Sequence, residues 1–264
     1  MAEKKRIDVY LFENGLVESR EKAKALIIAG AVYVDAQRCD KPSSTVGEGQ
    51  DVTLKKAQDY VSRGGKKLEK ALKCFNIDLN GIAAVDVGAS TGGFTDCMLQ
   101  HGAKFVYAVD VGYGQLAWSL RQDSRVCVME HSNARYLKRD TFDKDVSFAS
   151  IDVSFISLRL ILPALMDALT APYGIVALIK PQFEAGKENV GKKGVVRDKN
   201  VHKDVIAGVI EFARGAGLAV CGLTYSPIKG PEGNIEYLAY FNSEGENALI
   251  DIKSVVEEAH TGVN

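Results

Sequence analysis

Six short apolar runs lie at regular intervals between residues 82 and 242, and longer stretches of mixed polarity separate them. Short apolar runs are typical of strands buried on both faces, and the stretches between them suit amphipathic helices. This alternation predicts an α/β fold, an open and largely parallel Rossmann-like sheet with helices on both faces. The predicted strands are residues 83–87, 105–110, 147–153, 174–179, 218–224 and 236–241.

The first sixty residues follow a different pattern. Apolar residues at helical spacing occur around Leu11 and again around Leu26, and Ser19 stands where an N-cap would begin the second helix. Gly30 ends that helix, and residues 32–35 and 51–54 alternate like two strands. We therefore expect a small ααββ domain at residues 1–56, a linker at 57–63 and a larger domain at 64–264.

Charge is distributed unevenly along the chain. The formal net charge is −1, but residues 1–73 have a net charge of +4 and residues 74–264 of −5. An excess of cations near the N-terminus favours binding to RNA, although a solvated helix face would also carry such residues. The cations that we expect to contact RNA phosphates from this region are Arg6, Arg20, Lys22, Lys24, Arg38 and Lys41.

The composition disfavours several other classes of protein. The five cysteines are scattered and none pairs as C-x-x-C, so we expect neither disulfides nor a metal site. No apolar stretch approaches the roughly 20 residues that span a bilayer, and no secretory leader is evident. These features predict a cytoplasmic protein without membrane contact.

A glycine-rich loop follows the first predicted strand of the sheet. It has neither the G-x-G-x-x-G spacing of a dinucleotide site nor the Gly-Lys-Ser/Thr of a phosphate loop. A structural turn would explain a lone glycine-rich loop, but Asp110 ends the next strand, where a carboxylate accepts the ribose hydroxyls of an adenosine. Asp86 precedes the loop and would suit the cationic methionine end of S-adenosylmethionine. The expected cofactor residues are Asp86, Gly88, Ala89, Ser90, Thr91, Gly92, Gly93, Phe94, Asp110 and, on the adenine side, Asn133.

Ionisable residues lie at the carboxyl ends of two predicted strands. Asp152 and Lys180 each come after an apolar run, and two further candidates, Lys67 and Glu236, come from distant segments. Capping of a helix by Asp152 and plain surface positions for the lysines are the alternatives. The methyl group of a sulfonium is already activated, so a methyltransferase must align donor and acceptor and handle the acceptor's proton.

A basic segment, residues 185–203, leaves the strand that carries Lys180. We expect it to overhang the acceptor site and to hold RNA backbone there, and a mobile solvated loop is the alternative. Its candidate RNA-binding residues are Lys187, Lys192, Lys193 and Arg197.

Two resemblances connect these observations. The pattern S-R-x-x-A-x-x-L-I-x-x-G-x-V-x-V over residues 19–34 resembles the alpha-L RNA-binding domain of the ribosomal S-four type. Along essentially its whole length the chain also resembles the TlyA family, whose members are named both as hemolysins and as ribosomal RNA cytidine 2′-O-methyltransferases. The segments that carry this resemblance are residues 61–65, 88–94, 110–118, 152–158, 180–184, 194–196 and 233–237.

The second resemblance implies a fold, a reaction and a set of catalytic residues. The larger domain is similar to FtsJ-type ribose methyltransferases, which have the class I S-adenosylmethionine-dependent fold. Their Lys-Asp-Lys-Glu tetrad falls here on Lys67, Asp152, Lys180 and Glu236. By that resemblance Lys180 activates the 2′-oxygen, Asp152 and Glu236 set its charge state, and Lys67 orients the hydroxyl or the ribose.

Two details qualify the match to the family. Lys66 competes with Lys67, and the spacing R-G-x-x-K-L favours Lys67, while His131 stands where the family often has arginine. The expected substrate is 16S or 23S RNA, or both, in ribosomal subunits, and we expect a monomer. The rival interpretations are a membrane-active hemolysin, which the absence of a spanning segment disfavours, and a non-catalytic assembly factor, which would be expected to have lost part of the tetrad.

Overall fold

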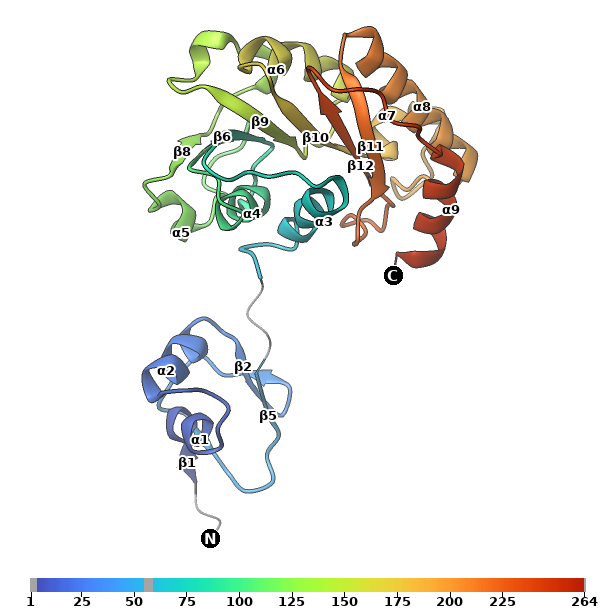
Figure 1. The fold of residues 1–264 in the computed structure, drawn as a ribbon. Helices are drawn as coiled ribbons and strands as arrows, with labels where there is room; N and C mark the ends of the chain where they lie inside the picture. The colour runs from blue at the N-terminus through green and yellow to red at the C-terminus, as the bar shows by residue number, and fades with distance from the viewer. Residues whose placement is uncertain (1–3, 55–58, 264) are drawn as a thin grey trace. The chain divides into compact units, whose positions relative to one another are not determined.

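The computed structural model describes residues 4–54 and 59–263 and divides into two compact units, Met1–Asp59 and Tyr60–Asn264 (Figure 1). Each unit is described by itself. Residues 57 and 58 of the expected linker lie outside the described residues. Residues 60–63 pack within the second unit: Tyr60 is buried, and the Val61 amide donates to Asp96 Oδ2 at 2.7 Å.

The N-terminal unit has the two helices and two main strands that the sequence predicts. Ser19 caps the second helix by accepting a hydrogen bond from the Lys22 amide at 3.1 Å. Three additional strands were not predicted, because a strand of two residues is too short to show an alternation of apolar and polar positions. The elements are β1 (Lys5–Arg6), α1 (Ile7–Glu13), α2 (Arg20–Ile28), β2 (Val32–Val34), β3 (Gln37–Arg38), β4 (Thr45–Val46) and β5 (Val52–Leu54). They enclose a small core of Ile7, Leu11, Ala23, Ile27, Val32, Cys39 and Val46.

The C-terminal unit is built on a seven-stranded sheet of order β11-β12-β10-β9-β6-β7-β8. The five strands from β10 to β8 in this order run parallel to one another. The strand β12 runs antiparallel to both of its neighbours, β10 and β11. The predicted Rossmann-like fold is therefore confirmed, with one strand reversed. The strands are β6 (Ala83–Val87), β7 (Phe105–Val109), β8 (Val126–Met129), β9 (Val146–Ile151), β10 (Gly174–Ile179), β11 (Ala219–Tyr225) and β12 (Tyr237–Asn242).

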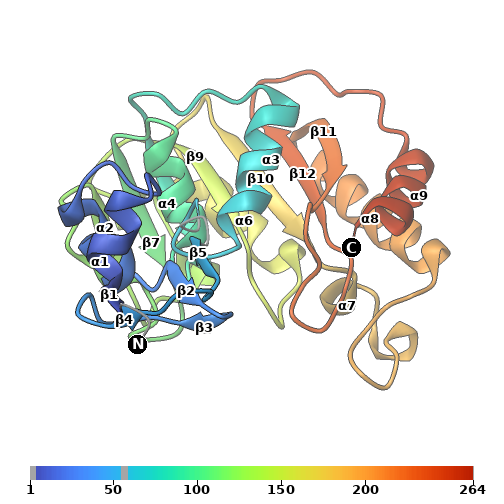
Figure 2. The ribbon, with the colours of Figure 1, turned by 90° about the horizontal axis from the view of Figure 1, so that it is seen from below.

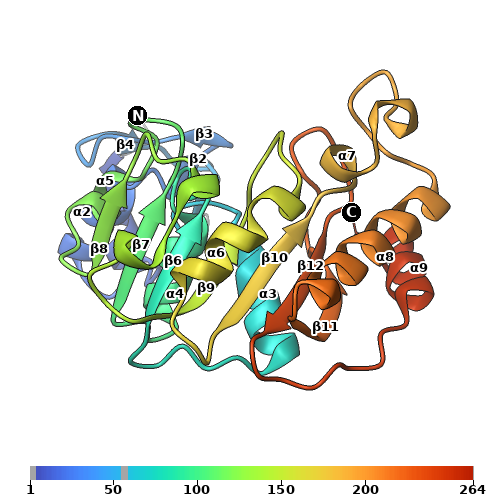
Figure 3. The ribbon, with the colours of Figure 1, turned by 90° about the horizontal axis from the view of Figure 1, so that it is seen from above.

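Helices cover both faces of this sheet, as Figures 2 and 3 show from opposite sides. Side chains alternate between the faces along each strand, so that in β6 Ala84 belongs to the apolar cluster that includes α3 and α4, while Val85 belongs to the cluster that includes α6 and α8. The helices of the unit are α3 (Gly65–Phe75), α4 (Gly93–Gln100), α5 (Trp118–Arg121), α6 (Leu162–Ala168), α7 (Pro181–Glu184), α8 (Lys199–Gly215) and α9 (Ile252–Gly262). Among the described residues, none of the helices has the length and apolar character needed to cross a membrane.

Candidate active site

Three of the four candidate catalytic residues stand at one edge of the sheet. Asp152 follows β9 and Lys180 follows β10, and these strands are parallel neighbours. Because β12 is antiparallel to β10, with Tyr237 paired to Ile179, its first end lies at the carboxyl end of β10. Glu236, the residue before β12, is therefore placed beside Lys180.

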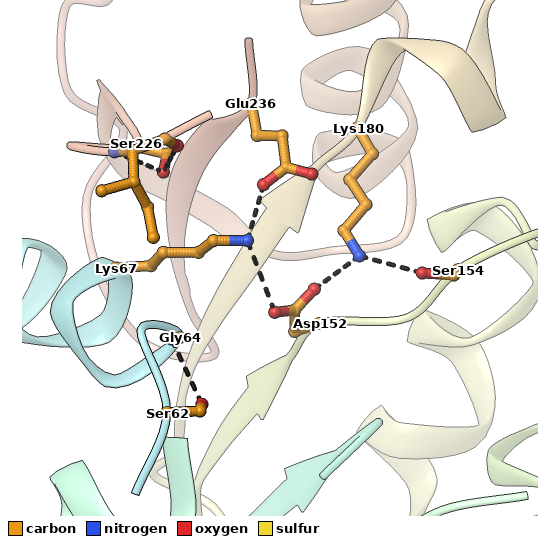
Figure 4. Close-up of polar contacts among 9 residues, drawn as sticks. Ser62, Gly64, Lys67, Asp152, Ser154, Lys180, Ser226 and Glu236 are labelled. Carbon is orange, nitrogen blue, oxygen red and sulfur yellow. Dashed lines mark hydrogen bonds and ion pairs between the residues drawn. The ribbon is translucent and has the colours of Figure 1, made fainter. Parts of the chain in front are cut away.

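Lys67 reaches the same edge from the first turn of α3. Its Nζ lies 2.7 Å from Glu236 Oε2 and 3.8 Å from Asp152 Oδ2. The other oxygen of Asp152, Oδ1, lies 2.6 Å from Lys180 Nζ. Figure 4 shows the resulting alternation of acid and base, Glu236, Lys67, Asp152 and Lys180, contributed by four separate elements. The structure thus brings all four residues together.

These charges are largely withdrawn from water. Lys67 and Lys180 are each 8% exposed and Glu236 is 1% exposed. An isolated buried charge is costly, and contact with opposite charges offsets that cost. Each lysine of the set contacts a carboxylate, so opposite charges can offset one another inside the protein. Lys66, the competing candidate on α3, is exposed and does not line the cavity that contains the four residues.

Two adjoining cavities meet at this charged wall. A cavity of about 210 Å³ is lined by the four charged residues and by Ala89, Thr91, Gly93 and Phe94 of the glycine-rich loop. A second, of about 460 Å³, is lined by Asp110, Asn133 and apolar residues that include Val111 and Ile161. The two share the lining residues Gly88, Ser90, Asp152 and Ser154. A ligand in the larger cavity therefore reaches a ligand in the smaller one at the charged wall.

The glycine-rich loop is tied to both neighbouring strand ends. Gly88 has φ +85°, and a Cβ there would lie 2.5 Å from the Asp152 carbonyl oxygen, so only glycine allows this close approach. Asp110 accepts the Ser90 amide through Oδ2 and the Gly112 amide through Oδ1, each at 2.7 Å. These bonds fix the Asp110 carboxylate at the edge of the larger cavity.

The larger cavity fits an adenosine-containing cofactor. Each carboxylate oxygen has a further lone pair beyond the one that accepts an amide, so Asp110 can also accept ribose hydroxyls. Asn133 accepts the Arg135 amide through its carbonyl oxygen at 3.1 Å, which leaves its amide nitrogen as the donor for a base. Apolar residues, among them Val109, Val111 and Ile161, form another part of the wall, as the faces of an adenine ring require.

Comparison with known proteins agrees with this geometry. The sequence matches the FtsJ-like methyltransferase family over residues 60–243 and the S4 domain family over residues 5–52. It is 53% identical to the Bacillus subtilis protein YqxC, over 98% of this chain and 95% of that one. It is 41% identical to the Mycobacterium tuberculosis protein named 16S/23S rRNA (cytidine-2′-O)-methyltransferase TlyA, over 100% of this chain and 99% of that one.

The chain belongs to the TlyA family of FtsJ-like methyltransferases. A solved structure described as a putative hemolysin from Streptococcus thermophilus has a TM-score of 0.76 at 49% identity, and the match covers 99% of this chain and 98% of that one. Both names of the TlyA family thus recur among the relatives, as the sequence resemblance led us to expect.

Two expected cofactor residues line neither cavity. Asp86 is fully buried and, by strand alternation, turns toward α4, where the Thr95 amide and hydroxyl donate to Oδ2 at 2.8 and 2.7 Å. Ser150 Oγ donates to its Oδ1 at 3.0 Å. Desolvation raises the pKa of Asp86 to about 7, against the hydrogen bonds that lower it. Asp86 thus braces α4, the helix that begins at the glycine-rich loop, and it does not face either cavity.

Gly92 also has a packing role. Its φ is +93°, and a Cβ there would lie 2.2 Å from Leu120 Cδ1. The residue lets α5 pack against the start of α4, and it supports the loop from behind rather than from within either cavity.

The candidate RNA-binding residues are mostly at the surface. Those of the basic segment, Lys187, Lys192, Lys193 and Arg197, are all exposed, and none lines either cavity. In the N-terminal unit Arg6, Arg20, Lys22, Arg38 and Lys41 are exposed, whereas Lys24 is half-buried. Arg6 and Arg20 pair with the buried Asp8, and Arg38 pairs with Asp40.

Sequence reasoning missed three residues around Lys180. Ser154 accepts a hydrogen bond from its Nζ at 3.1 Å. Phe155 is 90% exposed with φ +62°, and its ring lies 4.9 Å from that of Phe183. Glu184 holds the loop after β9 through hydrogen bonds from Ser157 Oγ and the Leu158 amide, both at 2.7 Å. The signal available for Phe155 was a large aromatic residue directly after a strand end, where packing does not require one.

Proposed function

We propose that this protein transfers a methyl group from S-adenosylmethionine to the 2′-hydroxyl of cytidines in ribosomal RNA. The observation that carries the proposal is the buried chain of Glu236, Lys67, Asp152 and Lys180 at the boundary between two adjoining cavities. A methyl donor in one cavity and a ribose in the other would meet at Lys180 and Asp152. The relative named as a 16S/23S rRNA (cytidine-2′-O)-methyltransferase supports this assignment.

The larger cavity is the proposed place of the cofactor. Asp110 would hold the ribose hydroxyls of its adenosine, Asn133 the adenine edge, and Gly88 and Ser90 of the glycine-rich loop the methionine part. When bound, S-adenosylmethionine supplies a methyl group that is already activated by its sulfonium. Asp86 keeps the loop in place from the opposite side.

Lys180 is the proposed proton acceptor. As the neutral amine, Lys180 would take the proton of the 2′-hydroxyl while that oxygen accepts the methyl group, and the donor sulfur would leave as a neutral thioether, so no further reactant would be needed. Asp152 balances the ammonium that results, and the contact between Lys67 and both acids holds Asp152 in position. Lys67 also lines the smaller cavity, where its ammonium can orient the ribose.

RNA is the proposed partner of both units. The S4 domain supplies exposed cations ahead of residue 56, and residues 185–203 supply a second basic surface that follows Lys180. Phe155, exposed in the loop that carries Ser154 and packed against Phe183, offers a ring on which an unstacked base can stack. We accordingly assign RNA affinity to residues 1–56 together with this basic segment, and the chemistry to residues 64–264.

The proposal is tested by incubating the protein with ribosomal subunits and cofactor labelled in its methyl group. We expect label in RNA, on ribose and at cytidine, as mapped by nuclease digestion and mass spectrometry. Calorimetry of the Asp110→Ala variant should show strongly weakened cofactor binding. Methylation of a base instead of a ribose, or preferential binding of NAD, would contradict the proposal.

A further inference from the structure

Lys180 has a second polar neighbour besides Asp152. Its Nζ donates a hydrogen bond to Ser154 Oγ at 3.1 Å and lies 2.6 Å from Asp152 Oδ1 (Figure 4). Ser154 lies two residues after Asp152 in the loop that follows β9, and it lines both cavities. The hydroxyl therefore stands where the proposed donor and acceptor meet.

The loop that carries Ser154 is anchored at both ends. Its first residue, Asp152, donates its amide to the Val87 carbonyl oxygen at 2.9 Å. Its far end is held by Glu184, whose two carboxylate oxygens accept from Ser157 Oγ and the Leu158 amide. Glu184 is the last residue of α7, the short helix that Lys180 precedes as N-cap. The same short segment thus fixes both Lys180 and the loop opposite it.

The stereochemistry of an amine makes this contact consequential. The nitrogen of a lysine side chain has four tetrahedral directions; Cε takes one of them and the hydrogen bond to Ser154 Oγ takes another. Asp152 Oδ1 lies 2.6 Å from the nitrogen as an ion-pair partner and accepts no hydrogen bond from the described residues. In the neutral amine the negative Asp152 oxygen repels the nitrogen lone pair, so an N–H held by Ser154 leaves the lone pair to point away from Asp152. Lys180 also lines the smaller cavity, where the acceptor ribose is proposed to bind.

We propose that Ser154 is a positioning residue that aims the Lys180 lone pair at the 2′-hydroxyl of the target ribose. This inference rests on the proposed function, because it assigns Ser154 a part in that reaction. Without the Ser154 hydroxyl the amine would rotate about its Cε–Nζ bond, and the lone pair would face the acceptor only part of the time. The loss would fall on the chemical step and not on the binding of RNA or cofactor.

Two nearly isosteric variants isolate the hydroxyl. Ser154→Thr keeps the Oγ acceptor, and Ser154→Val has the shape of threonine without it. We expect the single-turnover rate on ribosomal subunits to fall by about tenfold or more in Ser154→Val, as for loss of a hydrogen bond from a reacting group, and Ser154→Thr to retain most of the rate. KM for the subunits and affinity for S-adenosylhomocysteine should stay unchanged in both.

Ser157→Ala is the matched control, because it removes a hydroxyl from the same loop without touching Lys180. Equal rates for the threonine and valine variants would overturn the proposal, and so would a loss in Ser157→Ala as large as in Ser154→Val, since loop order would then explain both. A readout independent of activity is the exchange of the Lys180 ammonium protons, observed by ¹⁵N NMR, which should be slow with serine or threonine and fast with valine. If the wild-type protein methylates no RNA, the proposed function fails, whereas equal exchange in all three proteins overturns the Ser154 hydrogen bond itself.

Discussion

Each unit buries one carboxylate completely, and the two carboxylates behave in opposite ways. Asp8 in the N-terminal unit and Asp86 in the C-terminal unit are both 0% exposed. Hydrogen bonds from Arg6 and Arg20 lower the pKa of Asp8 to about 2, whereas Asp86 has only hydroxyl and amide donors and desolvation raises its pKa to about 7. Burial alone does not decide the charge of a carboxylate; the presence of a cationic partner does.

The cations differ between the units as well. The side chains of Arg6 and Arg20 are 50% and 47% exposed, so each can pair with Asp8 and still contact a phosphate. The side chains of Lys67 and Lys180 are only 10% and 9% exposed, and a ligand meets them from within the cavity. The first arrangement suits binding of a polyanion, and the second suits proton transfer in a defined geometry.

The largest effect that we expect concerns Lys180. Ala at this position should lower the rate of methyl transfer by about 10²-fold or more, as is usual on losing an acid–base group, while subunit binding largely survives. Arginine should not restore the rate, because a guanidinium keeps the charge but cannot accept the proton. Single-turnover assays on subunits measure both variants. Near-normal methyl transfer by Lys180→Arg would mean that Lys180 contributes only its positive charge. The cations of the two units would then not differ in function.

The Asp86→Asn variant tests the buried carboxylate whose hydrogen-bond donors are uncharged. The pKa of Asp86 is higher in the folded than in the unfolded protein, so the folded state holds a proton that the unfolded state releases, and stability is lost as pH rises through about 7. We expect urea unfolding of the wild-type protein to show a decline on the order of 2 kcal/mol between roughly pH 4 and pH 8 that the variant lacks. Identical pH profiles for the two proteins would show that Asp86 is compensated after all.

A third test targets the exposed cations of the N-terminal unit. Reversal of Lys22 and Lys41 to Glu is preferable to reversal of Arg20, which would place a second carboxylate against the buried Asp8. We expect RNA affinity to fall by about tenfold and the slope of log affinity against log salt to lose roughly two units. Cofactor affinity, measured by calorimetry, is the control. An unchanged salt slope would assign RNA binding to residues outside this surface.

The smallest effect concerns Asp8. Its pKa is lower in the folded than in the unfolded protein, so its ion pairs stabilise the N-terminal unit above about pH 4, and this contribution is lost as pH falls toward about 2. Because the two arginines are half-exposed, solvent screening should limit the contribution to about 1 kcal/mol. Hydrogen exchange of the α1 and α2 amides across this range measures it. Loss of protection near pH 5 would point to another group.

The sequence predicted most of the fold because its strands are apolar on both faces. The strands β6, β7, β9 and β10 and the hairpin β11–β12 were located to within two residues at each end. β8 was missed: it is the edge strand of the sheet, its four residues are only half-buried, and it lacks a long apolar run. The antiparallel direction of β12 could not be predicted from the sequence either, because the alternation of side chains is the same in a parallel and an antiparallel strand.

The sequence predicted less of the candidate site than of the fold. The positions of Asp152 and Lys180 after apolar runs suggested these two residues. The roles of Lys67 and Glu236 came only from the resemblance to a known family, because residues 169 positions apart show no local sequence pattern when they are in contact. A carboxylate at a strand end was expected to face the ligand, and the alternation of side chains along β6 instead turns Asp86 toward α4. Ser154 escaped notice because a serine in a loop has many ordinary explanations.

The reversed strand β12 also bears on the order in which the protein is completed. Since Glu236 arrives at the site only when β12 inserts between β10 and β11, a nascent chain that has already formed β6 to β10 carries Lys67, Asp152 and Lys180 without their fourth partner. Pairing across such a separation along the chain is among the slower steps of folding. On the ribosome, catalytic competence would therefore come last, after α8 and the hairpin have emerged, and the onset of methyl transfer would report that the whole sheet has closed.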